Sequence, residues 1–347
     1  MNPIDPSGPA RIRREEEDPY EARERPATTP KTSTAELPLH ALPDALSATP
    51  HGRRFLDATT LVKDAPPEKQ HTERVQRGLD AFRMKMTGWY RTPSGPVAVP
   101  TPFYMVPKDQ RKDPTKIRVT PEQLSLGAQA GLSPAAASRV FQGRGTPEEI
   151  HRVTQLLIDR QPPRASTPLE VRKLMFAHKI GTDCAGYVQQ AYLAASGQSR
   201  AQAGFQSIEN ESLSALPPRG FSRVDRLSDV RAGDVVVFPG ATPAETGHRG
   251  IVFAQRVATV QDMEKLRQCG VTGFDAGGPV RVLEVDSSWG SGDTSDWGGS
   301  QRRTFWFNDT TRQWATERPH PDGTTHATVS GAPYDHEGTV IYRGKDR

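Results

Sequence analysis

Residues 181–188 read Gly-Thr-Asp-Cys-Ala-Gly-Tyr-Val and contain one of the two cysteines of the chain. Asp183 and Thr182 are residue types that cap helix starts, and apolar residues recur at helical spacing from Tyr187 to Ala195. We therefore expect a buried helix that begins at or just before Cys184. The N–H groups at a helix start favour a thiolate, so this cysteine is a candidate nucleophile. The alternative is a small buried core residue.

A second pattern supplies a candidate base. Residues 227–238 predict a turn that leads into a buried strand. Residues 247–254 predict another strand, and His248 stands at its start. A base beside a thiolate needs such a rigid, partly open position. His178, expected in the preceding helix or turn, is the competing base. The other histidines are expected in a polar leader (His40, His51, His71), a helix (His151) or a loop-rich tail (His320, His326, His336).

Residues 280–289 predict a third strand that ends in a polar cluster. Alternation along it places Glu284, Asp286 and Ser288 on one face. A carboxylate on that face would accept a hydrogen bond from the second ring nitrogen of His248. Asp286 is preferred because it lies nearer the strand end, and Glu284 is the alternative. The Asp-Ser-Ser stretch is also compatible with the mere start of a turn.

Four motifs in a fixed order carry a family resemblance: Asp-Cys-Ala-Gly-Tyr-Val-Gln, Arg-Ala-Gly-Asp-Val-Val-Val-Phe, Gly-His-Arg-Gly-Ile-Val and Val-Asp-Ser-Ser. Over about residues 165–345 the chain resembles the NlpC-type bacterial cell-wall cysteine peptidases, a papain-like superfamily. The resemblance implies an α+β fold in which an antiparallel sheet packs against helices. It also implies Cys184 as nucleophile, His248 as base and acid, and Asp286 as the residue that orients the histidine. Residues expected to bind the oxyanion or the substrate are Asp183, Ala185, Gly186, Gly250 and Ser287.

The family resemblance further implies a reaction and a partner. Such enzymes cleave amide bonds in peptidoglycan stem peptides, typically between D-glutamate and the diamino acid. The expected partner is therefore peptidoglycan or its stem-peptide fragments, and the expected chemistry needs no metal and no organic cofactor. Papain-like acyltransferases and thioesterases use the same Cys and His, and the surrounding residues do not separate hydrolysis from transfer.

Three features depart from the family pattern. Ala185 stands where the family usually has Ser. The Pro-Tyr and Trp-Gly-Gly stretch, whose Tyr often helps to bind the oxyanion, is not recognisable in residues 170–180. The segment between His248 and Asp286 is long and contains an inserted piece at 260–270 that is expected to be helical. These departures affect the expected substrate more than the expected fold.

Composition divides the chain of 347 residues into three regions. Residues 1–70 are rich in Pro, Arg, Glu, Ser and Thr and lack an apolar period, which predicts a disordered leader. Residues 71–162 predict a mainly helical accessory region, and residues 163–347 the peptidase domain. The two cysteines do not suggest a disulfide framework, and Cys269 is expected to be a bystander.

The accessory region contains a second motif. Residues 121–140 predict two helices separated by a turn at Gly131, the second capped by Ser133 with Pro134 at its first position. Residues 120–160 resemble the helix-turn-helix of lac-repressor-type regulators, so a DNA-binding protein with an inactive hydrolase-like domain is an alternative. The alanine-rich start of the second helix offers mostly methyl groups to bases. With a net charge of only +4, we favour a helical hairpin beside the peptidase core, and nucleic acid is not expected as a partner.

The expected location follows from what the leader lacks. It has no apolar core of the length of a secretory signal, and no stretch of the chain is long enough to span a membrane. The protein is then either cytoplasmic or exported by a non-classical route to the cell wall or periplasm of its own or a target cell. The second case would suit an antibacterial effector or a phage-type cell-wall enzyme, with a delivery or immunity partner bound through the N-terminal region.

Overall fold

The computed structural model describes residues 67–104, 119–160, 165–203, 221–238, 247–275, 277–290, 298–319, 325–329 and 339–344. All of these residues belong to one compact unit. The expected leader therefore lies outside the described residues, apart from residues 67–70, which form the start of helix α2 (Pro67–Lys85). Within the described part of the chain, no helix has the length and apolar character needed to cross a membrane.

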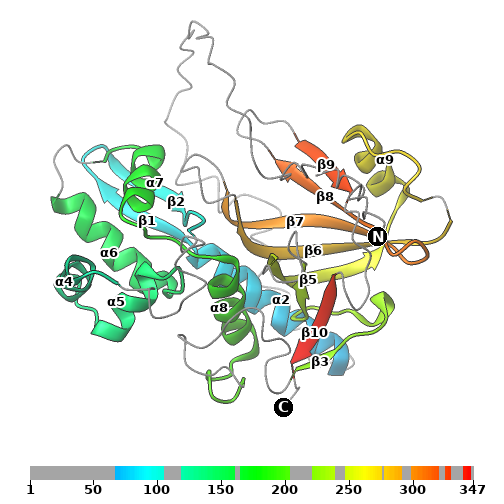
Figure 1. The fold of residues 1–347 in the computed structure, drawn as a ribbon, viewed down its shortest axis with the longest axis horizontal. Helices are drawn as coiled ribbons and strands as arrows, with labels where there is room; N and C mark the ends of the chain where they lie inside the picture. Colours follow the sequence, from blue (N-terminus) through cyan, green and yellow to red (C-terminus); the bar gives the residue numbers. More distant parts are fainter. Residues whose placement is uncertain are drawn as a thin grey trace, which may run out of the picture. The chain divides into compact units, whose positions relative to one another are not determined.

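Antiparallel pairing joins the described strands β3 to β10 into one eight-stranded sheet in the order β3-β10-β4-β5-β6-β7-β8-β9 (Figure 1). Their bounds are β3 (Phe221–Arg223), β4 (Val235–Val237), β5 (Arg249–Val257), β6 (Val280–Trp289), β7 (Gly299–Asn308), β8 (Trp314–Pro319), β9 (Thr325–Val329) and β10 (Val340–Gly344). The strands expected near residues 235, 249 and 280 are confirmed. The tail contains more strand than expected, and His326 lies in β9 and not in a loop.

Alternation along β6 divides the sheet into two faces. Val285 packs in an apolar cluster with Phe305. Its neighbour Asp286 points to the opposite face, where Ile251 of β5 is its direct cross-strand partner. Ile251 packs in a second cluster with Tyr187 of helix α8 (Cys184–Ser196). The sheet therefore buries both faces, and α8 covers the face that carries Asp286.

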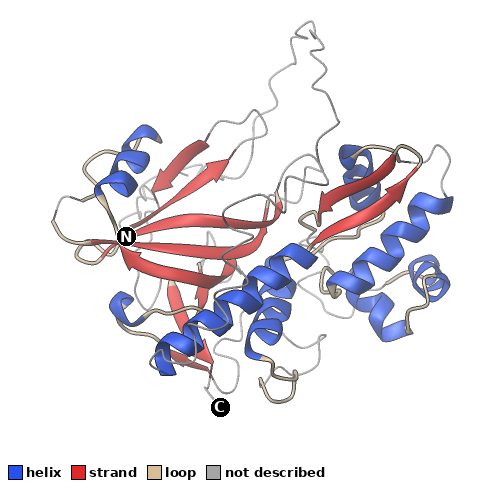
Figure 2. Cartoon of the chain, turned by 180° about the vertical axis from the view of Figure 1, so that it is seen from behind, coloured by secondary structure: helices blue, strands red, loops and turns tan. Residues whose placement is uncertain are grey.

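Helix α2 lies beside α8 on this face (Figure 2). The rings of Phe82 and Tyr187 meet edge to face with centroids 5.1 Å apart. A Cβ on Gly78 would lie 2.6 Å from Cα of Ala195, so the two helices approach as closely as backbones allow. Together with the antiparallel sheet, these helices confirm the α+β class.

The accessory region is helical with one hairpin. Besides most of α2, it contains β1 (Thr87–Thr92), β2 (Gly95–Pro100), α4 (Pro121–Gln129), α5 (Pro134–Phe141) and α6 (Pro147–Arg160). Helix α7 (Pro168–Ala177) follows at the start of the region expected to be the peptidase domain. The expected cap of α5 is confirmed, because the Ser133 hydroxyl accepts the N–H of Ala136 at 3.3 Å. Gly131 adopts φ +73°, which provides the expected turn. The expected helical insertion between β5 and β6 is α9 (Val260–Gln268).

Candidate active site

Cys184 is the first residue of α8, as the sequence pattern predicts. The carboxylate of Asp183 caps the helix, since its Oδ1 accepts the N–H of Gly186 at 2.5 Å. The helix ends at Gly197 in the left-handed conformation, with φ +68°. Local capping residues at both ends therefore fix the position of the thiol, and the body of the helix is buried against the sheet.

The electrostatic surroundings of the thiol differ from the expectation. Burial, followed by the neighbouring charge of Asp183, raises the pKa of Cys184 to about 11. The backbone N–H of Arg249 and its guanidinium oppose this rise, as does the N–H of Ala185. The expected lowering of this pKa by the helix start is therefore wrong for the protein without substrate. Desolvation outweighs the helix terminus, and the resting form is a protonated thiol.

Asp183 is surrounded by residues from other parts of the chain. Burial raises the pKa of its carboxyl, and the charges of Arg144 and Arg249 and the N–H of Gly186 oppose that rise. Burial and the nearby Asp183 in turn raise the pKa of Tyr104 to about 12. Two residues of the accessory region, Arg144 and Tyr104, thus lie close to the cap of the cysteine helix.

The turn after α5 closes on this cap. The N–H of Asp183 donates to the carbonyl oxygen of Gly143 at 3.0 Å, and the Thr182 hydroxyl donates to the same oxygen at 3.2 Å. A Cβ on Gly186 would lie 2.2 Å from that oxygen and 3.0 Å from Cα of Arg144. Gly186, expected as a substrate-binding residue, is therefore required here for close packing. The helix-turn-helix-like segment packs beside the cysteine helix, as favoured from the sequence.

A second segment of the accessory region also reaches the site. Phe103 forms a parallel bridge with Thr182, whose N–H donates to the carbonyl of Pro102 at 3.1 Å. Tyr104 follows directly, and a Cβ on Gly181 would lie 2.6 Å from Cβ of Tyr104. Tyr104 could not be predicted from the family pattern, in which the tyrosine stands a short distance upstream of the cysteine. Gly181 was the one local indication, because a glycine next to a buried helix cap allows another segment of the chain to approach the backbone closely.

His248 lies directly before β5 and its ring is stacked on Trp289, with centroids 4.1 Å apart. Continuation of the register from Ile251 and Asp286 places Arg249 opposite Ser288 and His248 opposite Trp289. The ring therefore faces the apolar side of the sheet, away from α8. The thiol instead meets the N–H of Arg249. That nitrogen is two bonds from Cα of His248, so sulfur lies within about 6 Å of this Cα.

Asp286 is fully buried and ion-paired with Arg302. Arg302 donates from Nε to Oδ1 at 2.8 Å and from Nη2 to Oδ2 at 2.9 Å, and its Nη2 also bonds Asp80 of α2 at 2.9 Å. Burial raises the pKa of Asp286, while Arg302 opposes that rise. This carboxylate lies on the α8 face, so the structure does not bring it to the His248 ring. Glu284 is on the same face, opposite Thr304.

Two of the flanking residues have structural partners. The Ser287 hydroxyl donates to the carbonyl of Arg249 at 2.5 Å, and Ser288 donates to the carbonyl of Thr182 at 2.7 Å. Ser288 thereby fastens the segment before Cys184 to the end of β6. A Cβ on Gly250 would lie 2.2 Å from Val285, so this glycine serves sheet packing. It does not open the sheet to a substrate.

The remaining candidates lie outside this cluster. His178 is the C-cap of α7, and burial lowers its pKa. Cys269 is the C-cap of α9 and is partly exposed. Among the described residues, no group of three or more His, Cys, Asp or Glu side chains is arranged to hold a metal ion. His320 and His336 lie outside the described residues.

Comparisons with protein families, with curated proteins and with solved structures find no match for this chain.

Proposed function

We propose that this protein is a papain-like, NlpC-type cysteine hydrolase that cleaves an amide bond in peptidoglycan stem peptides. One observation carries the proposal: the Cys184 thiol, at the first residue of α8, lies against the N–H of Arg249, the residue that follows His248. A helix-borne cysteine thus lies beside the backbone that follows the histidine, which is 64 residues further along the chain (248 − 184).

The raised pKa of Cys184 defines what the histidine has to do. A resting thiol is a poor nucleophile, so a base must remove its proton as the substrate binds. His248 is the base in this proposal. Its ring is stacked on Trp289 on the other side of the sheet, so the proposal requires the segment that carries His248, directly before β5, to reorient towards Cys184 when the substrate binds.

The reaction then follows acyl-transfer chemistry. The sulfur attacks the amide carbon and His248 takes the thiol proton; the backbone N–H of Cys184, at the start of α8, helps to stabilise the oxyanion. The imidazolium returns the proton to the leaving amine, and a thioester remains on Cys184. Water, deprotonated by His248, attacks the thioester, and the acid leaves as the thiol is restored. Tyr104, beside Asp183, is the accessory residue placed to line this site.

Product analysis tests the proposal. Purified full-length protein is incubated with peptidoglycan stem-peptide fragments, and the products are identified by mass. Wild type and Cys269→Ala are expected to generate new free amine and carboxyl ends, and Cys184→Ala none. Cys269 is a matched control because it is the second cysteine and lies on α9. Cleavage by Cys184→Ala overturns the assignment of the nucleophile, and products carrying an amine acceptor in place of water identify an acyltransferase.

A further inference from the structure

The hairpin of β1 and β2 has one buried face and one exposed face. Tyr90 and Val99 point inward and are buried on the side of the accessory helices, where α6 contacts β1 and α7 contacts β2 (Figure 1). The alternate residues stand on the outer face in three cross-strand pairs, which are Thr87 with Pro100, Trp89 with Ala98 and Arg91 with Pro96. Trp89, at the centre, is 62% exposed. A tryptophan is seldom left so open, because its burial removes about 150–250 Å² from water.

Side chains of α6 hold the backbone beneath the two largest residues of this outer face. Gln155 accepts the N–H of Arg91 at 2.9 Å and donates to its carbonyl oxygen at 3.0 Å. His151 donates from Nε2 to the carbonyl oxygen of Trp89 at 2.7 Å. The backbone positions of Trp89 and Arg91 are therefore fixed before any ligand binds, which lowers the entropic cost of binding.

The same bonds close one edge of the hairpin, and two prolines restrict the other edge. The backbone of Arg91 bonds outward to α6, so the three cross-strand pairs of the outer face are not hydrogen-bonded pairs. The backbone nitrogens of Pro96, Ala98 and Pro100 consequently point to the outer edge of β2, where only Ala98 has an N–H. Arg172 already donates from Nη1 to the carbonyl oxygen of Pro100 at 3.1 Å. An added strand would find too few partners, so a ligand has to be held by side chains of the outer face.

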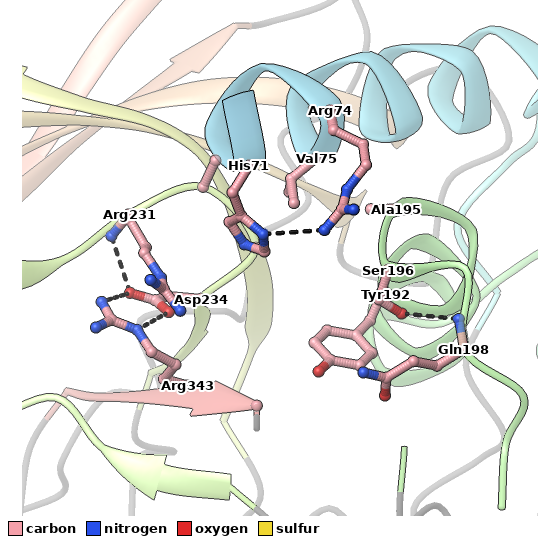
Figure 3. A pocket seen from close by; sticks show the side chains of 13 residues that line it. His71, Arg74, Val75, Tyr192, Ala195, Ser196, Gln198, Arg231, Asp234 and Arg343 are labelled. Atoms are coloured by element: carbon pink, nitrogen blue, oxygen red, sulfur yellow. Dashed lines mark hydrogen bonds and ion pairs between the residues drawn. The ribbon is translucent and has the colours of Figure 1, made fainter. Parts of the chain in front are cut away.

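Arg91 provides hydrogen-bond donors next to the indole. It follows Trp89 by two residues in β1, so both side chains point outward from backbone positions about 7 Å apart. The guanidinium is exposed and has no partner among the described residues. In the hollow between α2, α8 and β10, by contrast, the guanidinium of Arg343 is bonded to Asp234 (Figure 3). A ligand that covers Trp89 therefore meets a charged donor that is not yet used.

We propose that the outer face of the hairpin binds a sugar ring of a polysaccharide strand. The face of an indole carries partial negative charge and attracts the weakly positive C–H groups on the flat side of a sugar ring. Arg91 and the hydroxyl of Thr87 then bond the hydroxyl and amide oxygens of the sugar. These groups stand on one face, so a single ring can contact all of them.

The size and composition of the outer face argue against two other partners. A stable protein interface takes about 20–30 residues a side, whereas this face has six. Single-stranded nucleic acid is bound by a row of aromatic side chains along a groove with several cations. The outer face has one aromatic ring and one arginine. A sugar ring matches this small set of contacts.

The polysaccharide is the glycan strand of peptidoglycan, and this choice rests on the proposed function. The hairpin leads directly to the candidate active site: β2 ends at Pro100, and Phe103 forms the bridge with Thr182, two residues before Cys184. At most about 25 Å of contacting chain separates the end of the hairpin from the thiol. A glycan strand bound to the outer face would therefore hold its stem peptides near Cys184.

Binding of peptide-free glycan strands and of the tetramer of N-acetylglucosamine tests the proposal. Calorimetric titrations use the full chain carrying Cys184→Ala, so turnover plays no part, and saturable binding is expected. Trp89→Ala should weaken it at least about tenfold, and Trp89→Phe should lose less, because a smaller aromatic face remains. Arg91→Gln should weaken it about tenfold.

Two exposed residues outside the outer face provide matched controls. Val260→Ala removes apolar surface from α9, where Val260 is 78% exposed, and Arg77→Gln removes an exposed guanidinium from α2. Both variants should bind like the parent protein. The indole N–H signal of Trp89 is expected to move when saccharide is added, and this check does not depend on the folding of a variant.

The site is overturned if neither saccharide binds saturably, or if Trp89→Ala binds as well as Val260→Ala. Tighter binding of a single-stranded oligonucleotide would assign the outer face to nucleic acid. A dimer that forms with rising concentration and is lost in Trp89→Ala would assign it to a second copy of the chain. Saccharide binding without cleavage of stem peptides would contradict the proposed function alone, and cleavage without saccharide binding would contradict this site alone.

Discussion

The carbonyl oxygen of Gly143 accepts the backbone N–H of Asp183 at 3.0 Å. This bond joins the turn after α5 to the cap of the helix that carries Cys184. The helix-turn-helix-like segment is therefore part of the candidate active site, and its main-chain atoms help to hold the cysteine helix in place. A change at this contact is expected to act on both stability and thiol position.

Gly186→Ala tests this contact because two effects oppose each other. Alanine in a helix is intrinsically favoured over glycine by about 1 kcal/mol. Its Cβ would lie 2.2 Å from the Gly143 oxygen, however, so the turn must move. We expect a net loss of about 1–3 kcal/mol in the free energy of unfolding, measured by urea denaturation, together with reduced hydrolysis. A stabilised variant would show that the turn does not press on the helix.

Asp183→Asn removes the negative charge of the N-cap residue of α8 but keeps a side chain that can accept the capping hydrogen bond. Asparagine is an equally good N-cap, so α8 is expected to stay intact. Loss of the carboxylate removes the second cause of the raised Cys184 pKa. We expect the thiolate fraction at a fixed pH below the midpoint to rise about tenfold or more. Thiolate absorbance is followed against pH in a Cys269→Ala background.

The pH dependence of stability provides a second readout for Asp183→Asn. The pKa of Cys184 is about 11 in the folded protein, above the value of about 8.5 for an unfolded chain. The resulting stabilisation is complete below pH ~8.5 and is lost as the pH rises towards the folded value. Asp183→Asn should lower the folded pKa of Cys184 and so narrow the pH range, above pH ~8.5, over which this stabilisation is lost. If the pH dependence of stability is the same in Asp183→Asn as in the wild type, burial alone raises the pKa of Cys184.

The elements that position the site are predictable because their signals are local. Capping residues and helical spacing predict the start of α8 at Cys184, and alternation predicts the two faces of β6. The strands of the tail are not predictable because β8 and β9 are short and polar, and they are held by the pairing of β8 with β7 and of β9 with β8, not by an apolar period. Such pairing is a long-range contact that no short window contains.

The side-chain partners within the site were less predictable. Asp286 lies on the predicted face, yet its partner is Arg302 on the next strand, and no local pattern distinguishes a salt bridge from a bond to His248. Tyr104 comes from a segment far upstream whose place is decided by bridging at Thr182. The same limitation applies to the thiol pKa, because the helix start is readable from sequence and the depth of burial is not.

Arg302→Gln tests the role of Asp286. Removing the arginine leaves a fully buried carboxylate without its main counter-charge, so we expect a loss of about 3–5 kcal/mol in unfolding free energy. Arg267→Gln is the control, since its ion pair with Glu264 is about half exposed and should contribute less than about 1 kcal/mol. A small effect of Arg302→Gln would show that the buried Asp286 carboxyl does not depend on this ion pair.

Duplex DNA is not expected to bind the accessory helices. In α5 the exposed start is small and uncharged, and Arg139 is held in an ion pair with Glu149 of α6. A fluorescent duplex at low salt should therefore show the same anisotropy with and without the full-length protein. If binding does appear, its loss with rising salt and in Arg139→Gln would identify this segment as the DNA-binding surface.

His248→Gln and His178→Gln decide which histidine is the base. The raised pKa of Cys184 makes a base necessary for attack, so removal of the true base should reduce kcat by at least about a hundredfold. We expect that loss for His248→Gln, with the free energy of unfolding changed by less than about 1 kcal/mol. His178→Gln should retain activity, because His178 caps α7. The decisive measurement is kcat against pH: the limb that reports the base should vanish in His248→Gln and persist in His178→Gln. The opposite pattern would identify His178, the C-cap of α7, as the base, and His248 would then serve only to pack against Trp289.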